Sequence, residues 1–461
     1  MNSSRDRRWL RWVILVVVLA IVALFALFGW RPLARRAGIV VPAAAQTVPA
    51  AMFSPTASDA PQGAGTVSPA PVPSSFRPAS AQKVDAVVQA TGVTPNSTMS
   101  VRDLTTGAAL SSTRADDPVV PASTMKLMTT ISLVDKVGAT TTFDTKVVME
   151  SPSSIVLVGG GDPLLASSKS AYNYGEPLPP TTEELAAQTA AALKARGISQ
   201  VSLGYDDSLF TGDARHPGWQ PGDMEFVNDI SALMVDEGGG STTPAASAAS
   251  TFAGQLAANG IQVNGAPSSQ QVTSSAEALA TVHSLPLSEI VQQCLRHSDN
   301  TIAETLFRHL AIAYGQPASF DGGVTALHQA MTDLGLWSPA DSLHDGSGLD
   351  EADRLTSSSL SQAIVLAASR EELRPILPGL PVAAATGTLD SRFIDAASSA
   401  GGGRVRAKTG SLDISGALVG YTPTADGSMV AFAIVANGAG TDFRPYLDKL
   451  AAGLASCSCS S

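Results

Sequence analysis

The stretch PASTMKLMTT, residues 121–130, decides how the rest of this chain is interpreted. Its apolar entry predicts an extended segment that turns into a helix reaching about Val137. A hydroxyl in the first turn of a helix lies where backbone N–H groups are unpaired and the macrodipole is positive. Lys126 follows Ser123 by three residues on the same helix face, so a neutral amine there can accept the hydroxyl proton.

A single S-x-x-K spacing is a weak signal. Ser80 and Lys83 have the same spacing in a Pro/Ser-rich run that we interpret as linker. The pair that begins at Ser123 is strengthened by two later motifs, Ser298-Asp299-Asn300 and Lys408-Thr409-Gly410-Ser411. S-x-x-K, S-D-N and K-T-G in this order form the three-part signature of serine enzymes that recognise β-lactams.

Composition narrows the classes of protein to which the chain can belong. It has 461 residues, 44% of them hydrophobic, which is enough for two or three domains with apolar cores. The formal net charge of −11 is uneven, because residues 1–36 hold seven Arg and one Asp and the remainder carries −17. An acidic body argues against a nucleic-acid partner. A carboxylate ligand would need a local cation, which draws attention to Lys408.

The first 36 residues predict a cytoplasmic tip and a membrane anchor. The 19 residues from Trp12 to Trp30 contain no charge and would span about 28 Å as a helix, close to the roughly 30 Å hydrocarbon layer. Arginines follow this run where a cleavable signal peptide would have small residues, so we expect an uncleaved transmembrane helix. Residues 37–82 are rich in Ala, Pro and Ser and predict a disordered linker.

Periodicity and turn signals place the motifs on secondary structure. Helical spacing of apolar side chains runs through residues 287–314 and is interrupted at Ser298-Asp299-Asn300, which predicts a polar elbow between two helices. Lys408 should lie on the first strand of a C-terminal antiparallel meander. Strands are predicted at 98–103, 108–112, 404–408, 417–421 and 429–436.

The 171 residues between Lys126 and Ser298 are too many for a loop and predict an inserted domain. Within it we expect strands at 155–158 and 201–205 and a helix at 182–196. The predicted organisation is a tip and anchor (1–36), a linker (37–82), a discontinuous catalytic domain (83–141 and 284–456), an inserted domain (142–283) and a tail (457–461).

The cysteines, the histidines and the segment 344–347 indicate no disulfide, metal site or second catalytic site. Cys294, Cys457 and Cys459 show neither a disulfide framework nor zinc spacing, and the six His show no metal spacing. We expect Cys294 to be a small buried apolar residue. The segment 344–347 contains His, Asp and Ser, but position 345 is Asp where a nucleophile elbow needs Gly, so we reject a hydrolase triad.

With its motifs placed, the chain resembles the D-alanyl-D-alanine carboxypeptidases of the penicillin-binding protein 4 type, peptidase family S13, over about residues 83–450. The resemblance implies an α+β penicillin-binding/β-lactamase-like fold, with an antiparallel sheet of about five strands, a helical subdomain and inserted domains. After Leu349 the family often continues Ser-Arg, whereas Asp350-Glu351 stands here, which points to a different preferred stem-peptide side chain. Further similar segments are 158–163, 206–210, 216–219, 287–290, 345–349 and 387–393.

The resemblance implies acyl transfer through a covalent ester on Ser123. Ser123 attacks the carbonyl of the penultimate D-Ala, and Lys126 accepts its proton. Burial and the nearby charge of Lys408 keep Lys126 neutral. Ser298 relays a proton toward the departing D-Ala amine. Backbone N–H groups of Ser123 and Ser411 form the oxyanion hole.

The substrate-binding residues follow from the same resemblance. Asn300 positions the substrate amide, while Lys408 with the Thr409 and Ser411 hydroxyls binds the terminal carboxylate. Gly410 lets the strand edge approach the peptide closely. We expect the reaction to need no metal and no organic cofactor.

The expected substrate is a peptidoglycan stem peptide ending in D-Ala-D-Ala, with β-lactams as inhibitors. Because peptidoglycan lies outside the cytoplasmic membrane, we expect a single-pass membrane protein with its catalytic body on the cell-wall side. Two alternatives stay open, a β-lactamase and a non-catalytic cell-wall scaffold protein. The balance between carboxypeptidase and DD-endopeptidase activity is open as well.

Overall fold

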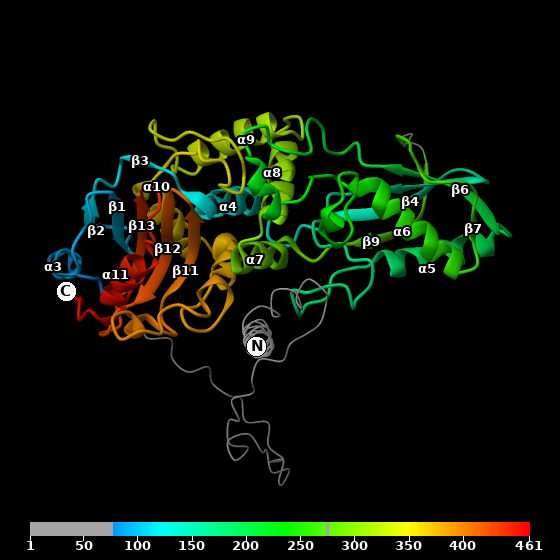
Figure 1. Ribbon diagram of the computed structural model, residues 1–461. Coiled ribbons are helices and arrows are strands. Elements are labelled where there is room, and N and C mark those ends of the chain that lie inside the picture. Colours follow the sequence, from blue (N-terminus) through cyan, green and yellow to red (C-terminus); the bar gives the residue numbers. More distant parts are fainter. Residues whose placement is uncertain (1–76, 273–275) are drawn as a thin grey trace, which may run out of the picture. The chain divides into compact units, whose positions relative to one another are not determined.

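The computed structural model describes residues 77–272 and 276–461 (Figure 1). The predicted anchor at Trp12–Trp30 and almost all of the predicted linker lie outside the described residues. Within the described part, no helix combines the length and the apolar character needed to cross a membrane.

A five-stranded antiparallel sheet joins early and late parts of the chain in the order β11-β12-β13-β1-β2. The central pairing places Val101 of β1 opposite Phe432 of β13. The predicted sheet of about five strands is confirmed, although its first C-terminal strand begins at Arg406 instead of residue 404. The strands are β1 (Ser97–Asp103), β2 (Ala109–Thr113), β11 (Arg406–Leu412), β12 (Ser415–Pro423) and β13 (Met429–Asn437).

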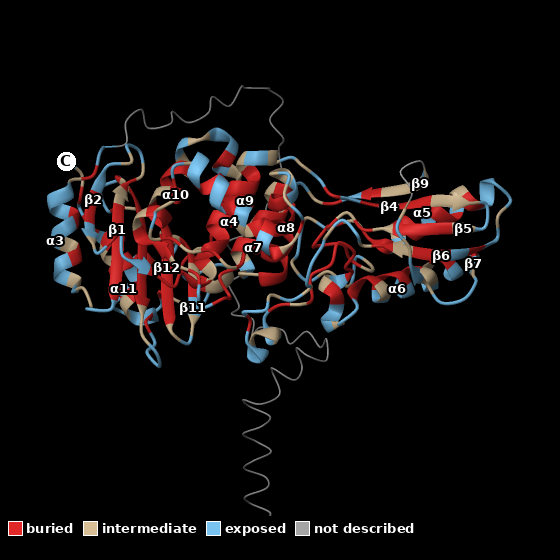
Figure 2. Cartoon of the chain, turned by 90° about the horizontal axis from the view of Figure 1, so that it is seen from above, coloured by how far each residue is buried: buried red, intermediate tan, exposed pale blue. Residues whose placement is uncertain are grey.

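Alternate side chains of β13 enter two different cores. Phe432 and Ile434 join the cluster on the α11 side, whereas Ala433 and Val435 join the cluster that contains α4. Both faces are apolar because helices cover both, and buried residues dominate the strands in Figure 2. One face is covered by α11 (Arg444–Ser456), which also packs on α3 (Ala81–Thr91), and the other by α10 (Ser357–Ser369).

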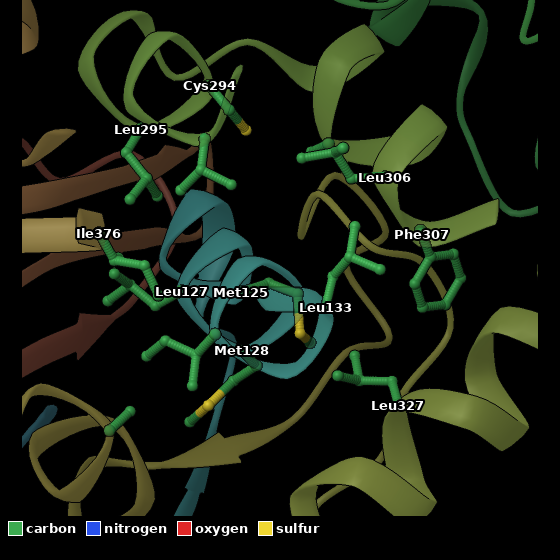
Figure 3. Packing of buried hydrophobic residues seen from close by; sticks show 14 of the residues in the cluster. Met125, Leu127, Met128, Leu133, Cys294, Leu295, Leu306, Phe307, Leu327 and Ile376 are labelled. Atoms are coloured by element: carbon green, nitrogen blue, oxygen red, sulfur yellow. The ribbon is translucent and has the colours of Figure 1, made fainter. Parts of the chain in front are cut away.

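Helix α4 (Met125–Val137) is the centre of the helical part. Its residues from Met125 to Val134 are all buried, so this helix is stable only inside a core. Figure 3 shows it surrounded by Leu295, Leu306 and Ile376 from three other elements. The elements that pack around α4 are α7 (Leu287–His297), α8 (Asn300–Ala313), α9 (Phe320–Asp333) and the 3-10 segment η6 (Glu371–Gly379). Two short strands, β3 (Pro118–Val119) and β10 (Leu355–Thr356), pair with each other.

A second sheet is built from residues inserted between α4 and α7, in the order β7-β6-β5-β4-β9 with β8 beside β6. The predicted strands and helix are confirmed as β5 (Ser154–Val158), β6 (Gln200–Asp206) and α5 (Thr182–Ala195). A capping box between Thr181 and Glu184 determines where α5 begins. The remaining elements are β4 (Asp144–Ser151), α6 (Pro244–Ala258), β7 (Gln262–Val263), β8 (Ser268–Ser269) and β9 (Glu277–His283).

Part of the inserted segment returns to the core around α4. Trp219, Val227 and Ile230 belong to the same buried cluster as that helix. The 3-10 turn η4 (Pro221–Glu225) lies within this return, between Trp219 and Val227, and η5 (Asp236–Gly240) follows it. The insertion therefore supplies part of the packing that supports the S-x-x-K helix, which its place in the sequence did not predict.

The start and the end of the described chain pack together, which corrects one interpretation. Ser80 and Lys83, interpreted as linker, belong to the beginning of α3, where Ser80 is the N-cap residue. The Lys83 Nζ donates to the Ser460 carbonyl at 2.7 Å, and Ala79 forms a β-bridge with Ser460. The second S-x-x-K copy therefore lies in ordered structure, on the surface and against the C-terminal residues.

The C-terminal cysteines provide a second correction. The spacing of Cys457 and Cys459 predicted no disulfide, yet the two residues are disulfide-bonded. One intervening residue leaves their Cα atoms 5.1 Å apart, inside the range that a disulfide requires. Cys294 is buried without a disulfide, as predicted.

Replacement of Leu450 by Ala should lower the free energy of unfolding by about 2–5 kcal/mol, because this side chain is fully buried between α11 and the sheet. Chemical denaturation of the purified protein measures the change. Lys449→Ala on the exposed side of the same helix is the matched control, with an expected change within about 0.5 kcal/mol. Equal losses for both variants would contradict the assigned packing.

Candidate active site

Ser123 lies in the connection between β3 and α4. The 3-10 turn η3 (Ala122–Thr124) leads directly into that helix, so Ser123 precedes its first residue by two positions. The Nζ of Lys126 is 2.9 Å from Ser123 Oγ. The amine predicted to reach the hydroxyl therefore does reach it.

The Lys126 amine is fully buried and surrounded by acceptors. Its Nζ donates to Ser123 Oγ, to Asn300 Oδ1 at 2.5 Å and to the Ser347 carbonyl at 2.9 Å. Burial lowers the pKa of Lys126, which enlarges the neutral fraction that can accept a proton. The groups that oppose this shift are Cys294, Asp345, Glu304 and Asp299.

The S-D-N motif forms the predicted polar elbow between α7 and α8. Ser298 ends α7 in the left-handed conformation, with φ of 59°. Asp299 caps α8 by accepting from the Ile302 N–H at 2.8 Å. Asn300 begins α8, and its Nδ2 donates to the Phe226 carbonyl at 2.9 Å. Both ends of the Asn300 amide are therefore engaged, one with the lysine amine and one with the inserted segment.

The K-T-G motif lies on β11 and contacts the elbow. Lys408 is fully buried, and its Nζ donates to Ser298 Oγ at 2.7 Å and to the Thr409 carbonyl at 2.8 Å. Burial, followed by the nearby charge of Lys126, lowers the pKa of Lys408 well below its ordinary value. The Thr409 hydroxyl is 2.8 Å from that of Thr388, a partner that the sequence interpretation left without a role.

Gly410 allows β11 to lie against the turn that carries Ser123. A Cβ at this position would be 2.8 Å from the Pro121 carbonyl oxygen and 3.1 Å from the Ala122 Cβ. The resemblance assigned this glycine to close approach of the peptide, whereas the contacts show close approach of the nucleophile turn. Ser411, the next residue, is exposed.

A buried loop that was given no role supports the lysine amine. The Asp345 carboxylate accepts from the Trp219 indole at 2.9 Å and from four backbone N–H groups of its own loop. Glu304 accepts from the Ser347 N–H at 2.7 Å, and the Ser347 carbonyl is the acceptor for Lys126. Sequence analysis missed Glu304, although its position four residues after the S-D-N asparagine puts both on one helix face.

The rejected triad is absent from the structure. Ser347 is fully buried, and its Oγ has no hydrogen-bond partner among the described residues. His344 Nε2 instead lies 3.2 Å from the Ser342 hydroxyl. Segment 345–349 therefore serves as support for the lysine amine.

The fold and the site together define a class of protein. A serine hydroxyl lies on a buried lysine amine, and a second buried lysine lies on the elbow serine two residues before Asn300. This is the geometry of serine acyl-transfer enzymes that recognise β-lactams. Within residues 77–272 and 276–461, no group of three or more His, Cys, Asp or Glu could hold a metal ion.

Comparison with known proteins identifies the family. The D-Ala-D-Ala carboxypeptidase 3 (S13) family matches residues 80–243 and 240–455. The chain is 33% identical over 375 residues to carboxypeptidase DacB of Mycolicibacterium smegmatis, covering 78% of this chain and 80% of that protein. It is 26% identical over 436 residues to the D-alanyl-D-alanine carboxypeptidase of an Actinomadura species, covering 73% of this chain and 77% of that protein. The chain belongs to the S13 family of D-Ala-D-Ala carboxypeptidases.

A solved structure shares the fold. The crystal structure of penicillin-binding protein 4 from Haemophilus influenzae matches with a TM-score of 0.66 at 22% identity, covering 80% of this chain and 98% of that one. The predicted α+β fold with an inserted domain is therefore shown, in the form of the penicillin-binding protein 4 type.

Replacement of Gly410 by Ala should slow acylation of Ser123 by a β-lactam about 100-fold, because the new methyl group displaces the nucleophile turn. Stopped-flow fluorescence with a reporter penicillin measures the rate. Gly254→Ala is the matched control, since a Cβ there meets nothing within 4 Å. A wild-type acylation rate for Gly410→Ala would contradict the close contact between β11 and η3.

Proposed function

We propose that this protein is a serine D-Ala-D-Ala carboxypeptidase that acts on peptidoglycan stem peptides through an acyl-enzyme on Ser123. The observation that carries the proposal is the 2.9 Å contact between the Lys126 amine and the Ser123 hydroxyl. Family membership supports the same reaction. The three motifs support the binding of β-lactams. The S-D-N motif joins the other two, because Asn300 contacts the Lys126 amine and Ser298 contacts the Lys408 amine.

Acylation begins when neutral Lys126 takes the proton of Ser123 Oγ as the oxygen attacks the carbonyl carbon of the penultimate D-Ala. The C–N bond to the terminal D-Ala then breaks. Ser298, hydrogen-bonded to Lys408, relays one proton to the departing amine and ends again as a hydroxyl, which balances the proton that Lys126 took from Ser123. Water hydrolyses the ester in the second half of the reaction, which restores the hydroxyl and releases the shortened peptide.

Binding and charge stabilisation use the third motif. The N–H groups of Ser123 and Ser411 donate to the developing oxyanion, and loss of one such donor typically costs about 3–4 kcal/mol in the transition state. Lys408, with the hydroxyls of Thr409 and Ser411, holds the terminal carboxylate. Asn300 orients the substrate amide while its own oxygen holds Lys126.

Two alternatives make different demands on the site. A β-lactamase needs a base that hydrolyses the acyl-enzyme rapidly. The buried Glu304 is engaged by the loop backbone, and Glu237 is engaged by Tyr174, so neither is placed to activate water at Ser123. A non-catalytic scaffold protein has no need for the buried amine at the nucleophile.

Intact-protein mass spectrometry after incubation with penicillin tests the function. The wild-type protein should gain one long-lived penicilloyl adduct, Ser123→Ala none, and Lys126→Arg should acylate at least about 100-fold more slowly because a guanidinium cannot act as base. Ser80→Ala and Lys83→Arg, in the second S-x-x-K copy, should label normally.

An absence of labelling in the wild-type protein would favour the scaffold alternative. An adduct that disappears within seconds would favour the β-lactamase. Full acylation of Lys126→Arg would refute the assignment of the base.

The proposed location is the cytoplasmic membrane, with Trp12–Trp30 as a single anchor and the catalytic body on the cell-wall side. The uncharged run and the extracytoplasmic substrate support this location. Full-length protein should sediment with membranes and resist high-salt extraction, while a chain lacking residues 1–36 should be recovered in the supernatant. Salt extraction of the full-length protein would contradict the anchor.

A further inference from the structure

A phenol and two carboxyl groups meet behind the S-D-N elbow. The Tyr174 hydroxyl lies 2.7 Å from Asp299 Oδ2 and also contacts Glu237 Oε1. Tyr174 comes from the loop between β5 and α5, Glu237 from η5, and Asp299 from the elbow itself. Two parts of the inserted segment therefore converge on the middle residue of a catalytic motif.

The number of protons in this cluster decides whether it holds together. A phenol has one proton and can donate it to only one carboxylate. If Glu237 is protonated, it donates to the Tyr174 oxygen, and Tyr174 donates to Asp299, so every contact is satisfied. If both carboxyl groups are ionised, one short oxygen–oxygen contact has no proton and becomes repulsive.

Asp299 transmits the state of this cluster to the site. One of its carboxylate oxygens caps α8 through Ile302, and the other accepts from Tyr174. Its chain neighbours are Ser298, held in the left-handed region at φ 59°, and Asn300, which contacts the Lys126 amine. A rotation of Asp299 would therefore move both functional neighbours.

The backbone at η5 is held in an uncommon conformation. Asp236 and Glu237 have φ of 51° and 56°, values that non-glycine residues rarely adopt. Asp236 is held by the Leu165 carbonyl, which accepts from its N–H at 3.0 Å, and by the Ser167 N–H, which donates to its carboxylate at 2.8 Å. This turn aims Glu237 at Tyr174.

We propose that Tyr174 and Glu237 are positioning residues that hold the S-D-N elbow in its productive geometry while Glu237 is protonated and release it as Glu237 ionises. This inference rests on the proposed function, since it concerns the rate at which Ser123 is acylated. It extends that function by making the rate depend on a carboxyl group outside the three motifs.

The surroundings of Glu237 place its titration in the neutral range. Burial and the nearby charge of Asp299 raise the pKa of Glu237 to about 7, and the hydrogen bond from Tyr174 opposes them. The cavity beside Glu237, about 160 Å³ and lined by Tyr172 and Tyr174, gives protons a route to it. Among the described residues, the other titratable groups that face this cluster are Lys126, Asp162, Tyr172, Asp236, Glu289, Cys294, Arg296 and His297.

The raised pKa of Glu237 decides how the elbow responds to pH. Below pH 7 Glu237 is protonated and the elbow is held, and above pH 7 the elbow loosens. Burial lowers the pKa of His297, which reduces the positive charge that this imidazole carries beside the cluster. Acylation by Lys126 otherwise gains from rising pH, because more of the amine is neutral.

The first experiment removes one hydroxyl. Tyr174→Phe should slow penicillin acylation about 10-fold and lower kcat on a D-Ala-D-Ala peptide with little change in KM, because the elbow and not the carboxylate site is disturbed. Tyr172→Phe is the matched control: its hydroxyl has no hydrogen-bond partner among the described residues, and its ring centroid is 5.6 Å from that of Tyr174.

The second experiment uses Glu237→Gln, whose amide donates to the Tyr174 oxygen at every pH. Acylation rates are measured from pH 5.5 to 9. The wild-type profile should contain a descending component with an apparent pKa near 7. Glu237→Gln should lack this component, match the wild-type rate within about twofold at pH 6 and exceed it at pH 8.5.

A wild-type rate for Tyr174→Phe, or an unchanged descending component in Glu237→Gln, would overturn the inference. An equal loss of rate in Tyr172→Phe would do the same, because it would assign the effect to packing alone. A wild-type protein that forms no penicilloyl adduct would instead reject the proposed function, and this inference with it.

Discussion

The burial of the Lys126 amine is the constraint on which the rest of the site depends. A lysine amine removed from water is expensive in its charged form, so its pKa falls and it can serve as a base near neutral pH. Its three acceptors come from three separate parts of the chain: Ser123, Asn300 and the Ser347 carbonyl. These acceptors fix the position of the amine at the hydroxyl.

Rigid elements hold each acceptor in place. The helix that carries Lys126 is buried on all sides, and β11 can lie against its N-terminal turn because Gly410 has no side chain. The loop that offers the Ser347 carbonyl is closed around the Asp345 carboxylate, which five N–H groups satisfy. A serine and an amine brought together in this way need little reorganisation when a substrate binds.

Much of the fold and the site could be predicted from sequence, but some contacts could not. The elbow at Ser298 was predicted because Ser, Asp and Asn interrupt a helical pattern locally. The place of Lys83 in α3 was not, because it depends on how the two ends of the chain pack. The Cys457–Cys459 disulfide was missed because two cysteines one residue apart were not counted as a pair, although their Cα atoms lie 5.1 Å apart. Glu304 was missed because its partner, the Ser347 backbone, carries no sequence signal.

By itself the sequence determined the chemistry of this protein, since a nucleophile, two amines and an elbow hydroxyl are residue types at specified spacings. It also determined the five strands of the first sheet, α4, α5 and the two helices that meet at the elbow, because their periodicity is local. Only the tertiary structure decided what surrounds those groups. The contacts of Tyr174 with Glu237 and with Asp299 join residues separated by up to 125 positions, and such pairings arise from packing that no local pattern encodes.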